Sequence, residues 1–535
     1  MTIISAHISA ARDPGNLSLE ASGLEASGLE ASGLEITGLT ADSRAVGPGF
    51  LFAALPGSKV DGRAFLADAL ARGAVAVLAP SGTVLPAGST ARLIVDDEPR
   101  RAFALMAAAF YGRQPDCAVA VTGTNGKTST VQFVRQLWSR LGHRAAALGT
   151  LGLAAGPGIE VAAVAGAGMT TPDPVALHAQ LAVLAGAGVD HLAMEASSHG
   201  LDQSRLDGVR LKAAAFTNLS RDHLDYHGSM PLYLTAKALL FTRVLPAGGI
   251  AVLNADAAEF AELAEICRAR GVHVLGYGSA GRELTVRAIE PTPHGQRLTL
   301  NILGHEAVVE LGLVGRFQAW NALCALGLVL ASDAAIGGLI ALGAPVPADL
   351  IQPALVELAA LEGVPGRMQA AGRHPSGAAV IVDYAHTPDA LETVLAALRP
   401  HAARRLVVVF GCGGDRDRGK RPVMGEIAAR LADRVIVTDD NPRSEVPAEI
   451  RRAVMAGCPE AEEIGDRAEA INSAVRALSA GDVLVIAGKG HEQGQIVGTE
   501  IRPFDDAAVA RVALSEIARV ALSEIARVAL AESAG

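Results

Sequence analysis

A glycine-rich turn between an apolar run and a helical pattern is the clearest chemical feature of this sequence. Residues 117–121 are apolar and predict the end of a buried strand, residues 122–129 read TGTNGKTS, and an amphipathic helix pattern follows. Glycines let successive backbone N–H groups face an anion, while the helix N-terminus, a lysine and a hydroxyl group near Mg²⁺ complete a phosphate site. The turn falls short of the full GxxxxGK[ST] pattern because position 121 is valine. We predict that the following residues bind a nucleoside triphosphate: Gly123, Thr124, Asn125, Gly126, Lys127, Thr128 and Ser129.

Other polar residues lie near the ends of apolar runs. Glu195 ends the run HLAME, His223 lies in SRDHLDYHG, and DDNPR (439–443) follows the run RVIVT. A carboxylate at a strand end can reach a metal ion beside the phosphate loop. Taken alone, Glu195 could equally be a helix cap or a surface acid, and His223 a hydrogen-bonded loop residue. The residue before Pro442 is typical of a helix start, so we expect a helix to begin there.

Alternating strand and helix patterns must position these residues. Between about residues 98 and 364 the runs CAVAV, HLAME, AAFTN and GIAVLN are each separated by helical sequence, and after about 365 the pattern restarts with AVIVDY, RLVVVF, RVIVT and DVLVIA. Such runs are typical of parallel sheets covered on both faces, with active loops at the strand carboxyl ends. Residues 36–97 contain short strands and one helix. We predict an α/β protein of several domains.

Composition excludes several classes of protein. The chain has 535 residues, half of them hydrophobic and 19% charged, with a net charge of −10. This apolar content excludes global disorder, and the acidic balance argues against a general binder of nucleic acid or anionic membranes. Five isolated cysteines form neither a disulfide framework nor a zinc motif. Without a secretory signal pattern at the start, we expect a cytoplasmic monomer that binds no nucleic acid and inserts into no membrane.

Three stretches have patterns that do not point to chemistry. The EASGL repeat at 20–35 fits neither helix nor strand periodicity and predicts a solvated extension, whereas the VALSEIAR repeat from 512 predicts an elongated terminal helix. Residues 320–348 resemble a membrane span in hydropathy, but Asp333 lies in the middle. A central Asp costs about 2.5–3.5 kcal/mol on insertion. We therefore predict two buried core helices there.

The combined motifs resemble the Mur ligase family, whose members form amide bonds with ATP in peptidoglycan precursor synthesis. The resemblance covers about residues 36–510 and rests on TGTNGKT (122–128), TTP (170–172), MEASSHGL (194–201), FTNLSRDHLDYHG (216–228), YLTAK (233–237), GRFQAWN (315–321), PGR (365–367), DYAHTP (383–388) and DNPR (440–443). It implies three domains: a UDP-MurNAc-substrate domain (1–97), a central P-loop ATP-binding domain with a parallel sheet (98–364) and a C-terminal Rossmann-like amino-acid-binding domain (365–535).

The resemblance implies ATP and Mg²⁺ as cofactors and an acyl-phosphate intermediate. A carboxylate is a poor acyl donor until it is phosphorylated, and its approach to the anionic γ-phosphate requires cations and helix N-termini. Lys127, Glu195, His223 and Lys237 are the implied catalytic residues. Lys237 would be solvated by its helical context alone; the family implies that it is carboxylated to N6-carboxylysine and helps to hold Mg²⁺. Thr128 and Glu195 are implied to hold the metal ion beside the phosphate loop, and His223 a second metal ion.

Further binding residues are carried over from the family motifs. Asn321, Arg367 and Asp383 match nucleotide-contacting positions, while the role of His386 stays open. The family usually has Asn where Met169 stands, so that contact is in doubt. The UDP-sugar peptide is expected to contact Ala41, Ser43, Ser58, Lys59, Val60, Thr170, Thr171, Ser197, Gln203 and Arg205.

The incoming amino acid is implied to be meso-diaminopimelate, added to UDP-MurNAc-L-Ala-D-Glu. Its far end carries a carboxylate, which Arg443 can bind bidentately, and an ammonium group, from which Asp440 can accept hydrogen bonds. Lysine has no distal carboxylate, so it would leave the guanidinium unpaired. The expected contacts are Arg416, Asp440, Asn441, Pro442, Arg443, Gly488 and Glu492.

Four alternatives remain open from the sequence. A lysine-adding homologue and, more distantly, a folylpolyglutamate synthetase-like ligase share the phosphate loop. A nucleotide-switched binding protein would hydrolyse ATP without ligation, and a UDP-sugar-binding module would need no ATP.

Overall fold

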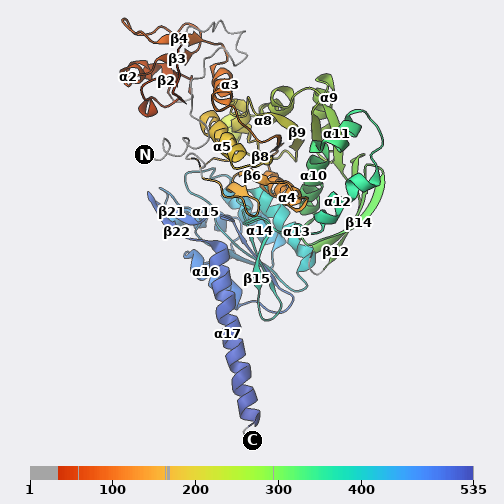
Figure 1. The fold of residues 1–535 in the computed structure, drawn as a ribbon. Coiled ribbons are helices and arrows are strands. Elements are labelled where there is room, and N and C mark those ends of the chain that lie inside the picture. Colours follow the sequence, from red (N-terminus) through yellow and green to blue (C-terminus); the bar gives the residue numbers. More distant parts are fainter. Residues whose placement is uncertain (1–33, 58–59, 163, 165–168, 293–294, 534–535) are drawn as a thin grey trace. The chain divides into compact units, whose positions relative to one another are not determined.

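The computed structural model describes residues 34–57, 60–162, 164, 169–292 and 295–533 (Figure 1). They form two compact units. The first runs to Thr285 and also contains Leu323–Ala354, and the second contains Val286–Ala322 and the chain from Leu355 onward.

The first unit begins with a small parallel sheet in the strand order β1-β2-β3-β4. Its strands are β1 (Gly38–Thr40), β2 (Phe50–Ala53), β3 (Ala76–Ala79) and β4 (Arg92–Val95). Alternate strand residues face opposite sides of a sheet. Accordingly, Leu51 packs with Phe103 of α3 (Pro99–Tyr111), whereas its neighbour Phe52 packs with Leu66 of α2 (Leu66–Ala71) on the other side.

The larger sheet of the first unit has the order β11-β10-β9-β5-β8-β6-β7. Its strands are β5 (Cys117–Thr122), β6 (Ala145–Gly149), β7 (Gly152–Ala155), β8 (His191–Glu195), β9 (Leu211–Phe216), β10 (Ile250–Asn254) and β11 (His273–Gly278). All neighbours pair in parallel except the β6–β7 hairpin, and the start of β12 (Leu284–Thr292) joins β11. The strand with the glycine-rich turn therefore lies between β8 and β9, so the residues that follow these three strands meet at one edge.

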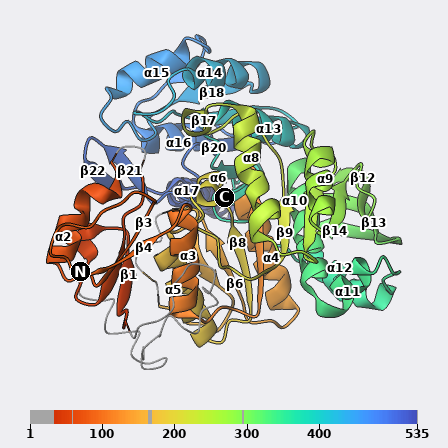
Figure 2. The ribbon, with the colours of Figure 1, turned by 90° about the horizontal axis from the view of Figure 1, so that it is seen from above.

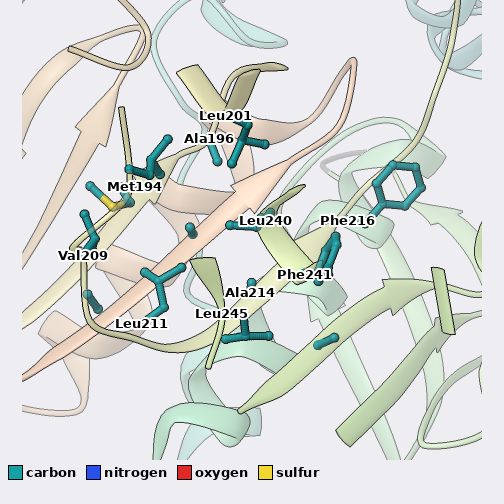
Figure 3. Packing of buried hydrophobic residues seen from close by; sticks show 14 of the residues in the cluster. Met194, Ala196, Leu201, Val209, Leu211, Ala214, Phe216, Leu240, Phe241 and Leu245 are labelled. Carbon is teal, nitrogen blue, oxygen red and sulfur yellow. The ribbon is translucent and has the colours of Figure 1, made fainter. Parts of the chain in front are cut away.

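Helices cover both faces of this sheet. They include α4 (Lys127–Arg140), α5 (Pro174–Gly186), α6 (Ser198–Asp202), α7 (Leu224–His227), α8 (Met230–Leu239) and α9 (Phe260–Ala269). Helix α5 lies beside α3 (Figure 2). Figure 3 shows part of the core, where Met194 of β8 and Phe216 of β9, the two strands that flank β5, pack with Leu201, Leu240 and Phe241. Each such side chain contributes about 1.5–3 kcal/mol by leaving water.

The second unit contains a six-stranded sheet in the order β15-β16-β20-β17-β18-β19. The strands are β15 (Gln369–Arg373), β16 (Ala379–Asp383), β17 (Leu406–Phe410), β18 (Arg434–Val437), β19 (Glu462–Glu463) and β20 (Val483–Ala487); only β15 is antiparallel to its neighbour. This unit also holds the hairpins β13 (Gly295–Ile302) with β14 (His305–Leu311) and β21 (Gly494–Val497) with β22 (Glu500–Pro503). The predicted restart of the α/β pattern after residue 365 is confirmed.

Two layers of helices cover that six-stranded sheet. Helices α13 (Pro388–Leu398), α14 (Lys420–Leu431) and α15 (Pro447–Met455) contribute to one core, while α16 (Arg467–Arg476) and α17 (Asp506–Ser533) contribute to the other. The predicted terminal helix is confirmed as α17. The EASGL repeat lies outside the described residues except for its last two positions.

The apolar stretch after residue 315 forms α10 (Arg316–Ser332) and α11 (Ala334–Ala341), followed by α12 (Ala348–Leu358). Helix α10 is almost wholly buried, as predicted, but α11 buries only Ile336 and Gly337, so the second predicted core helix is half exposed. Asp333 is exposed and caps α11 by accepting from the backbone N–H groups of Ala335 and Ile336. Among the described residues, no single helix is long and apolar enough to cross a membrane. The pair α10 and α11 passes by length and composition alone and bends by 91°.

Candidate active site

The glycine-rich turn connects the buried strand β5 to α4, which begins at Lys127. Gly123 has a φ of 144°, and a Cβ atom there would collide with Oγ1 of Thr217. The turn therefore needs glycine both for its backbone angle and for the close approach of the next strand's end. Thr128 and Ser129 are buried in the first turn of α4. This geometry matches the predicted anion site at a helix N-terminus.

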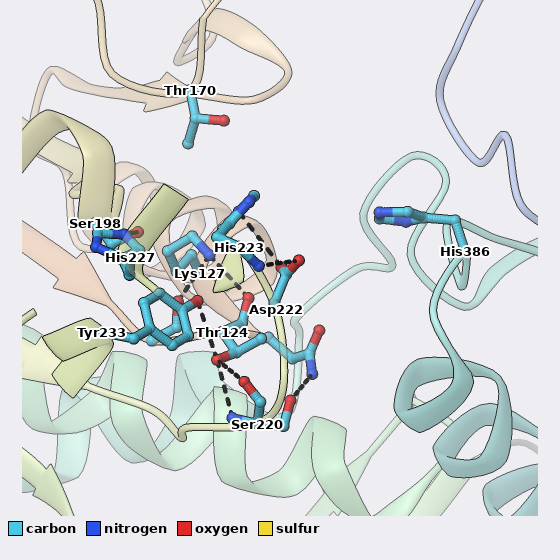
Figure 4. A network of polar contacts seen from close by, with 12 residues as sticks. Thr124, Lys127, Thr170, Ser198, Ser220, Asp222, His223, His227, Tyr233 and His386 are labelled. Atoms are coloured by element: carbon cyan, nitrogen blue, oxygen red, sulfur yellow. Dashed lines mark hydrogen bonds and ion pairs between the residues drawn. The ribbon is translucent and has the colours of Figure 1, made fainter. Parts of the chain in front are cut away.

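The segment after β9 holds the turn in place (Figure 4). Asn218 accepts from the backbone N–H of Asn125 through Oδ1 at 2.9 Å, and Thr217 donates to the carbonyl of Asn125 at 2.6 Å. Oγ1 of Thr124 accepts from the backbone N–H of Ser220 at 3.0 Å. These bonds fix the loop before any ligand arrives, so less conformational entropy is lost on binding.

Two lysines converge on this loop. Lys127 donates from Nζ to the carbonyls of Gly123 and Thr124, both at 2.9 Å. Lys237 of α8 donates from Nζ to the same Gly123 carbonyl at 2.7 Å and lies 4.3 Å from the ring centroid of Tyr233. Lys237 is only 1% exposed, in contrast to the solvated position that its helical context alone predicts.

Burial shifts the pKa of Lys237. Desolvation lowers the pKa of its amine well below the ordinary range, and the positive charge of Lys127 lowers the pKa further. A neutral amine has a free electron pair, whereas an ammonium ion has none. A lowered pKa favours the neutral form, and reaction with CO₂ requires that form.

Glu195 ends β8, directly beside β5. Its side chain is buried and accepts from Thr150, through the backbone N–H at 2.8 Å and through Oγ1 at 3.1 Å. The Glu195 carbonyl accepts from Oγ1 of Thr171 at 3.0 Å. The carboxylate is thus held in one orientation at the carboxyl edge of the sheet, where the sequence predicted it.

His223 lies in an aromatic and imidazole cluster next to the loop. Its backbone φ is 52°, an uncommon value for histidine, and Nε2 is 3.4 Å from Oδ2 of Asp222. The rings of His199 and His227 complete the cluster, and His227 Nε2 is 3.0 Å from Oγ of Ser198. Burial lowers the pKa of His223, and burial with its imidazole neighbours lowers that of His199 to about 4. Neutral imidazoles can accept protons or bind cations.

The donor set of the first unit fits a magnesium ion. Mg²⁺ is usually held by one or two carboxylates together with waters and substrate phosphates, not by a closed protein cage. Glu195 supplies an oriented carboxylate and Thr128 a hydroxyl beside the phosphate loop. Among the described residues, the ligand atoms of Glu195 and His223 do not gather with a third such group within 4.8 Å.

The peptide-contacting candidates form a second polar network. Thr171 Oγ1 accepts from the backbone N–H and the hydroxyl of Ser197, each at 3.0 Å. Arg205 donates to the carbonyl of Thr171 at 2.8 Å and to Oε1 of Gln203 at 2.7 Å. Thr170 shares a hydrogen bond with the hydroxyl of Thr150 at 3.1 Å.

The candidates of the N-terminal sheet are less informative. Ser43 is buried in the first turn of the 3₁₀ helix Ser43–Ala45, and Ala41 and Val60 are exposed. Ser58 and Lys59 lie outside the described residues.

In the second unit, the DDNPR segment follows β18. No helix begins at Pro442; Arg443 forms an isolated bridge, a turn follows at Ser444, and α15 starts only at Pro447, so the predicted helix start was wrong. The reason is tertiary: Arg443 has a φ of 52° and bridges to β21, donating from its backbone N–H to the carbonyl of Ile496 at 3.0 Å. Its side chain donates from Nη1 to the carbonyl of Gly414 at 2.9 Å. The guanidinium is thereby held by a neutral partner.

Lys489 is the functional candidate that the sequence did not single out. It is fully buried and donates from Nζ to Oδ1 of Asn441 at 3.0 Å and to Oε2 of Glu492 at 2.9 Å. Asn441 in turn donates to Oε2 of Glu492 at 2.8 Å. The close spacing of Lys489 and Glu492 in AGKGHE, after a predicted strand, was the available signal. A Cβ atom on Gly488 would meet Oδ2 of Asp440 at 2.7 Å, which places that carboxylate in the same group.

The remaining candidates of the second unit lie near the end of β16. The buried Asp383 accepts from the backbone N–H groups of Met368 at 2.7 Å and Ala385 at 2.8 Å, and burial raises its pKa although Arg367 opposes the rise. The guanidinium of Arg367 lies 4.5 Å from the ring centroid of Tyr384.

The three remaining candidates of the second unit are His386, Asn321 and Arg416. His386 Nδ1 is 2.8 Å from the carbonyl of Tyr384, Asn321 donates to Gln318 at 3.1 Å, and Arg416 is exposed.

Comparison with known proteins assigns these features to one family. The Mur ligase family catalytic domain matches residues 35–111, the Mur ligase middle domain matches 121–329, and the Mur ligase glutamate ligase domain matches 366–490. The chain belongs to the Mur ligase family. The N-terminal, central and C-terminal segments of this Mur ligase each carry one of the matched domains, which confirms the predicted three-domain α/β architecture.

Curated relatives of this Mur ligase share one name. A protein of Caulobacter vibrioides is 52% identical over 482 residues, covering 90% of this chain and 95% of the relative, and one of Mesorhizobium japonicum is 50% identical over 478 residues, covering 89% and 94%. Both are named UDP-N-acetylmuramoyl-L-alanyl-D-glutamate–2,6-diaminopimelate ligase.

Solved structures agree with the family fold. One described by that same name is 34% identical with a TM-score of 0.64, covering 90% of this chain and 95% of the other. A MurF ligase of Thermotoga maritima in complex with ADP, at 18% identity and a TM-score of 0.54, covering 90% and 96%, shows the fold alone.

Proposed function

We propose that this Mur ligase joins meso-diaminopimelate to the D-Glu carboxylate of UDP-MurNAc-L-Ala-D-Glu, using ATP. The observation that carries the proposal is the group of Asp440, Asn441, Arg443, Lys489 and Glu492 at the carboxyl ends of β18 and β20. In this group the carboxylates of Asp440 and Glu492 can bind an ammonium group, and the buried Lys489 and half-buried Arg443 can bind a carboxylate. An amino-acid head carries both of these charged groups. The shared name of relatives that are about half identical supports the same substrate.

The proposed reaction has two steps. A D-Glu carboxylate oxygen attacks the γ-phosphorus of ATP, the bond to the bridging oxygen breaks, and ADP leaves. The amine nitrogen then attacks the acyl carbon, inorganic phosphate leaves, and the nitrogen loses a proton. Both steps need neutralisation of crowded negative charge.

Residues of the chain supply most of that neutralisation. Lys127 is held only 2.9 Å from loop carbonyls, and an anionic phosphate is a stronger partner for an ammonium group than a neutral carbonyl is. The N-terminus of α4 adds partial positive charge. Thr128, Glu195, His223 and the N6-carboxylated form of Lys237 would hold Mg²⁺, which, when bound, supplies further charge neutralisation between carboxylate and phosphate. Arg367 and Asp383 are proposed to contact the nucleotide.

Product analysis tests the substrate. The full-length protein is incubated with ATP, Mg²⁺, the UDP-dipeptide and equal amounts of meso-diaminopimelate and L-lysine, and products are identified by mass spectrometry. We expect the diaminopimelate tripeptide as the main product and ADP release only when both acceptor and amine are present. A lysine tripeptide would support the lysine-adding alternative. ATP hydrolysis without a lengthened product would overturn ligation altogether.

An arginine variant tests the specificity group. Arg443→Ala should raise the KM for diaminopimelate by about tenfold or more, since it removes a charge-assisted pair worth about 1.5–3 kcal/mol, and should leave the KM for ATP nearly unchanged. Arg430→Ala, an exposed arginine of α14 paired with Glu392, is the matched control. An equal loss of diaminopimelate and ATP binding would assign Arg443 a structural role.

We further propose a cytoplasmic monomer that acts without nucleic acid or membrane. All five cysteines are free and buried, which fits a reducing compartment, and the net charge of −10 disfavours phosphate polymers. Light scattering of the purified protein tests the monomer.

A further inference from the structure

A cluster of two histidines and one aspartate lies away from the residues discussed above. Ligand atoms of His143, Asp190 and His191 all lie within 4.8 Å of one another. Nδ1 of His191 is 2.8 Å from Oδ1 of Asp190, and the two imidazole rings are 3.9 Å apart between centroids with a tilt of 34°. His143 is exposed, whereas Asp190 and His191 are half-buried.

Regular backbone structure fixes these three residues. His191 is the first residue of β8 and is in register with Ala145 of the neighbouring β6. Asp190 donates its backbone N–H to the carbonyl of Arg144 at 3.0 Å, and His143 donates its own to the carbonyl of Trp138 in α4 at 2.9 Å. The buried Trp138 ring packs edge-on against His191 with centroids 4.9 Å apart. The ligand atoms are therefore held close together by the sheet itself.

The cluster is at the amino edge of the sheet, opposite the phosphate loop. His191 begins β8 and Glu195 ends it, which separates them by roughly 13 Å at 3.3 Å per residue. Along α4, the 14 residues from Lys127 to Arg140 span about 20 Å. An ion bound at the cluster would be distinct from the proposed Mg²⁺ site.

The charges around the cluster favour a cation. Partial burial and His191 lower the pKa of the His143 imidazole, whereas Asp190 and Asp333 oppose that shift, so two carboxylates lie near this ring. The guanidinium of Arg144 is occupied by the carbonyls of Gly188 and Ala187, at 2.9 and 3.0 Å. The thiol of Cys117, which is in register with His191, does not belong to the group of ligand atoms within 4.8 Å.

We propose that His143, Asp190 and His191 bind a divalent transition-metal ion such as Zn²⁺ or Ni²⁺, with water completing the coordination shell. Two imidazoles and one carboxylate are a ligand set typical of these ions and poor for Mg²⁺. Metal–ligand bonds of about 2.1 Å require the ligand atoms to lie closer together than 4.8 Å. Rotation of the exposed His143 ring brings its nitrogen closer to the other two ligand atoms. The ion would replace the His191–Asp190 hydrogen bond and cross-link the amino ends of β6 and β8.

Zinc titration of the full-length protein tests the site. Calorimetry in excess Mg²⁺ should show one Zn²⁺ bound by the wild-type protein. His143→Gln and Asp190→Asn should each lower the Zn²⁺ affinity by about 10–100-fold, at least the loss seen when a residue that only orients a metal ligand is removed. His143→Gln is the primary variant because an exposed side chain can be replaced without unfolding the protein. His305→Gln, on the β14 hairpin, is the matched control and should bind like the wild type.

Fluorescence gives a second measurement. Ni²⁺ bound beside His191 should quench Trp138 in a Trp320→Phe background, and His143→Gln should abolish this quenching at the same Ni²⁺ concentration. Equal zinc affinity in the wild type and His143→Gln, or unchanged quenching in that variant, would overturn the proposal. Because neither measurement involves turnover, failure here would leave the proposed ligase function untouched.

Discussion

At the scale of single residues, burial decides what the titratable groups of this Mur ligase can do. Lys237 and Lys489 are both lysines without solvent access, yet their surroundings differ. Lys237 faces a carbonyl, an aromatic ring and another cation, so its amine is driven toward the neutral form. Lys489 faces the carboxylate of Glu492 and the amide oxygen of Asn441, which are partners for an ammonium group.

Carboxylation of Lys237 is the first residue-scale prediction. Protein equilibrated with ¹³C-labelled CO₂ should show one carbamate carbon signal by NMR, because the neutral amine can react. Lys237→Gln should remove the signal and most of the ligase activity. Lys212→Gln, an exposed lysine of β9, should change neither. A carbamate signal that survives in Lys237→Gln would assign the modification elsewhere.

Lys489 is predicted to position the amino-acid-binding group. Lys489→Met leaves the Glu492 carboxylate and the Asn441 amide without their buried cation, so we expect a loss of about 1–3 kcal/mol in unfolding free energy and a raised KM for diaminopimelate. A double-mutant cycle with Glu492→Gln measures the coupling between the two side chains. Strictly additive effects in denaturant unfolding and in KM would contradict a shared network.

At the scale of elements, the glycine-rich turn depends on three adjacent strands. The loop after β5 is bound by the segment after β9, and Glu195 reaches the same edge from β8. The order β9-β5-β8 brings these segments together although about 100 residues of chain separate the first from the last.

Gly123→Ala should damage this element severely. The added Cβ would meet Thr217 Oγ1, and alanine disfavours a φ of 144°, so ATP affinity measured by calorimetry should fall at least tenfold and the protein should be destabilised by about 1–3 kcal/mol. Gly338→Ala in α11 is the control, since no heavy atom lies within 4 Å of a Cβ built there. It should be neutral or stabilising by about 0.5–1 kcal/mol.

At the scale of the whole molecule, two compact units each carry part of the chemistry. Phosphate-loop and metal-binding candidates lie in the first, and the candidates for diaminopimelate lie in the second. Helix α17 packs against the second unit, where its side chains Ala507, Ala510 and Leu514 are part of the hydrophobic core. Asp506 at the start of α17 forms a buried ion pair with Arg467 at 2.7 Å.

Truncation separates the anchoring part of α17, which includes the first VALSEIAR repeat, from the repeat sequence after Arg519. A chain ending at Arg519 keeps the ion pair and these core contacts, so its melting temperature and ligase activity should match the full chain. A chain ending at Phe504 leaves Arg467 buried without its partner, which costs about 3–5 kcal/mol, and should unfold at a markedly lower temperature. Scanning calorimetry distinguishes the two. A shorter chain that melts like the full one would show that the pair does not anchor the unit.

The sequence by itself determined the repeating strand and helix pattern, the phosphate loop and the family motifs, because these depend on local periodicity and on residue types at short spacing. It placed Glu195 correctly at a strand end for the same reason. The tertiary structure alone decided that Lys237 is buried with a lowered amine pKa, that Lys489 joins Asn441 and Glu492, that Pro442 begins no helix, and that His143 meets His191. Each of these features depends on which distant segments of the chain become neighbours and on how much water the packed segments exclude. Neither is set by local sequence, because both arise only when distant segments pack together.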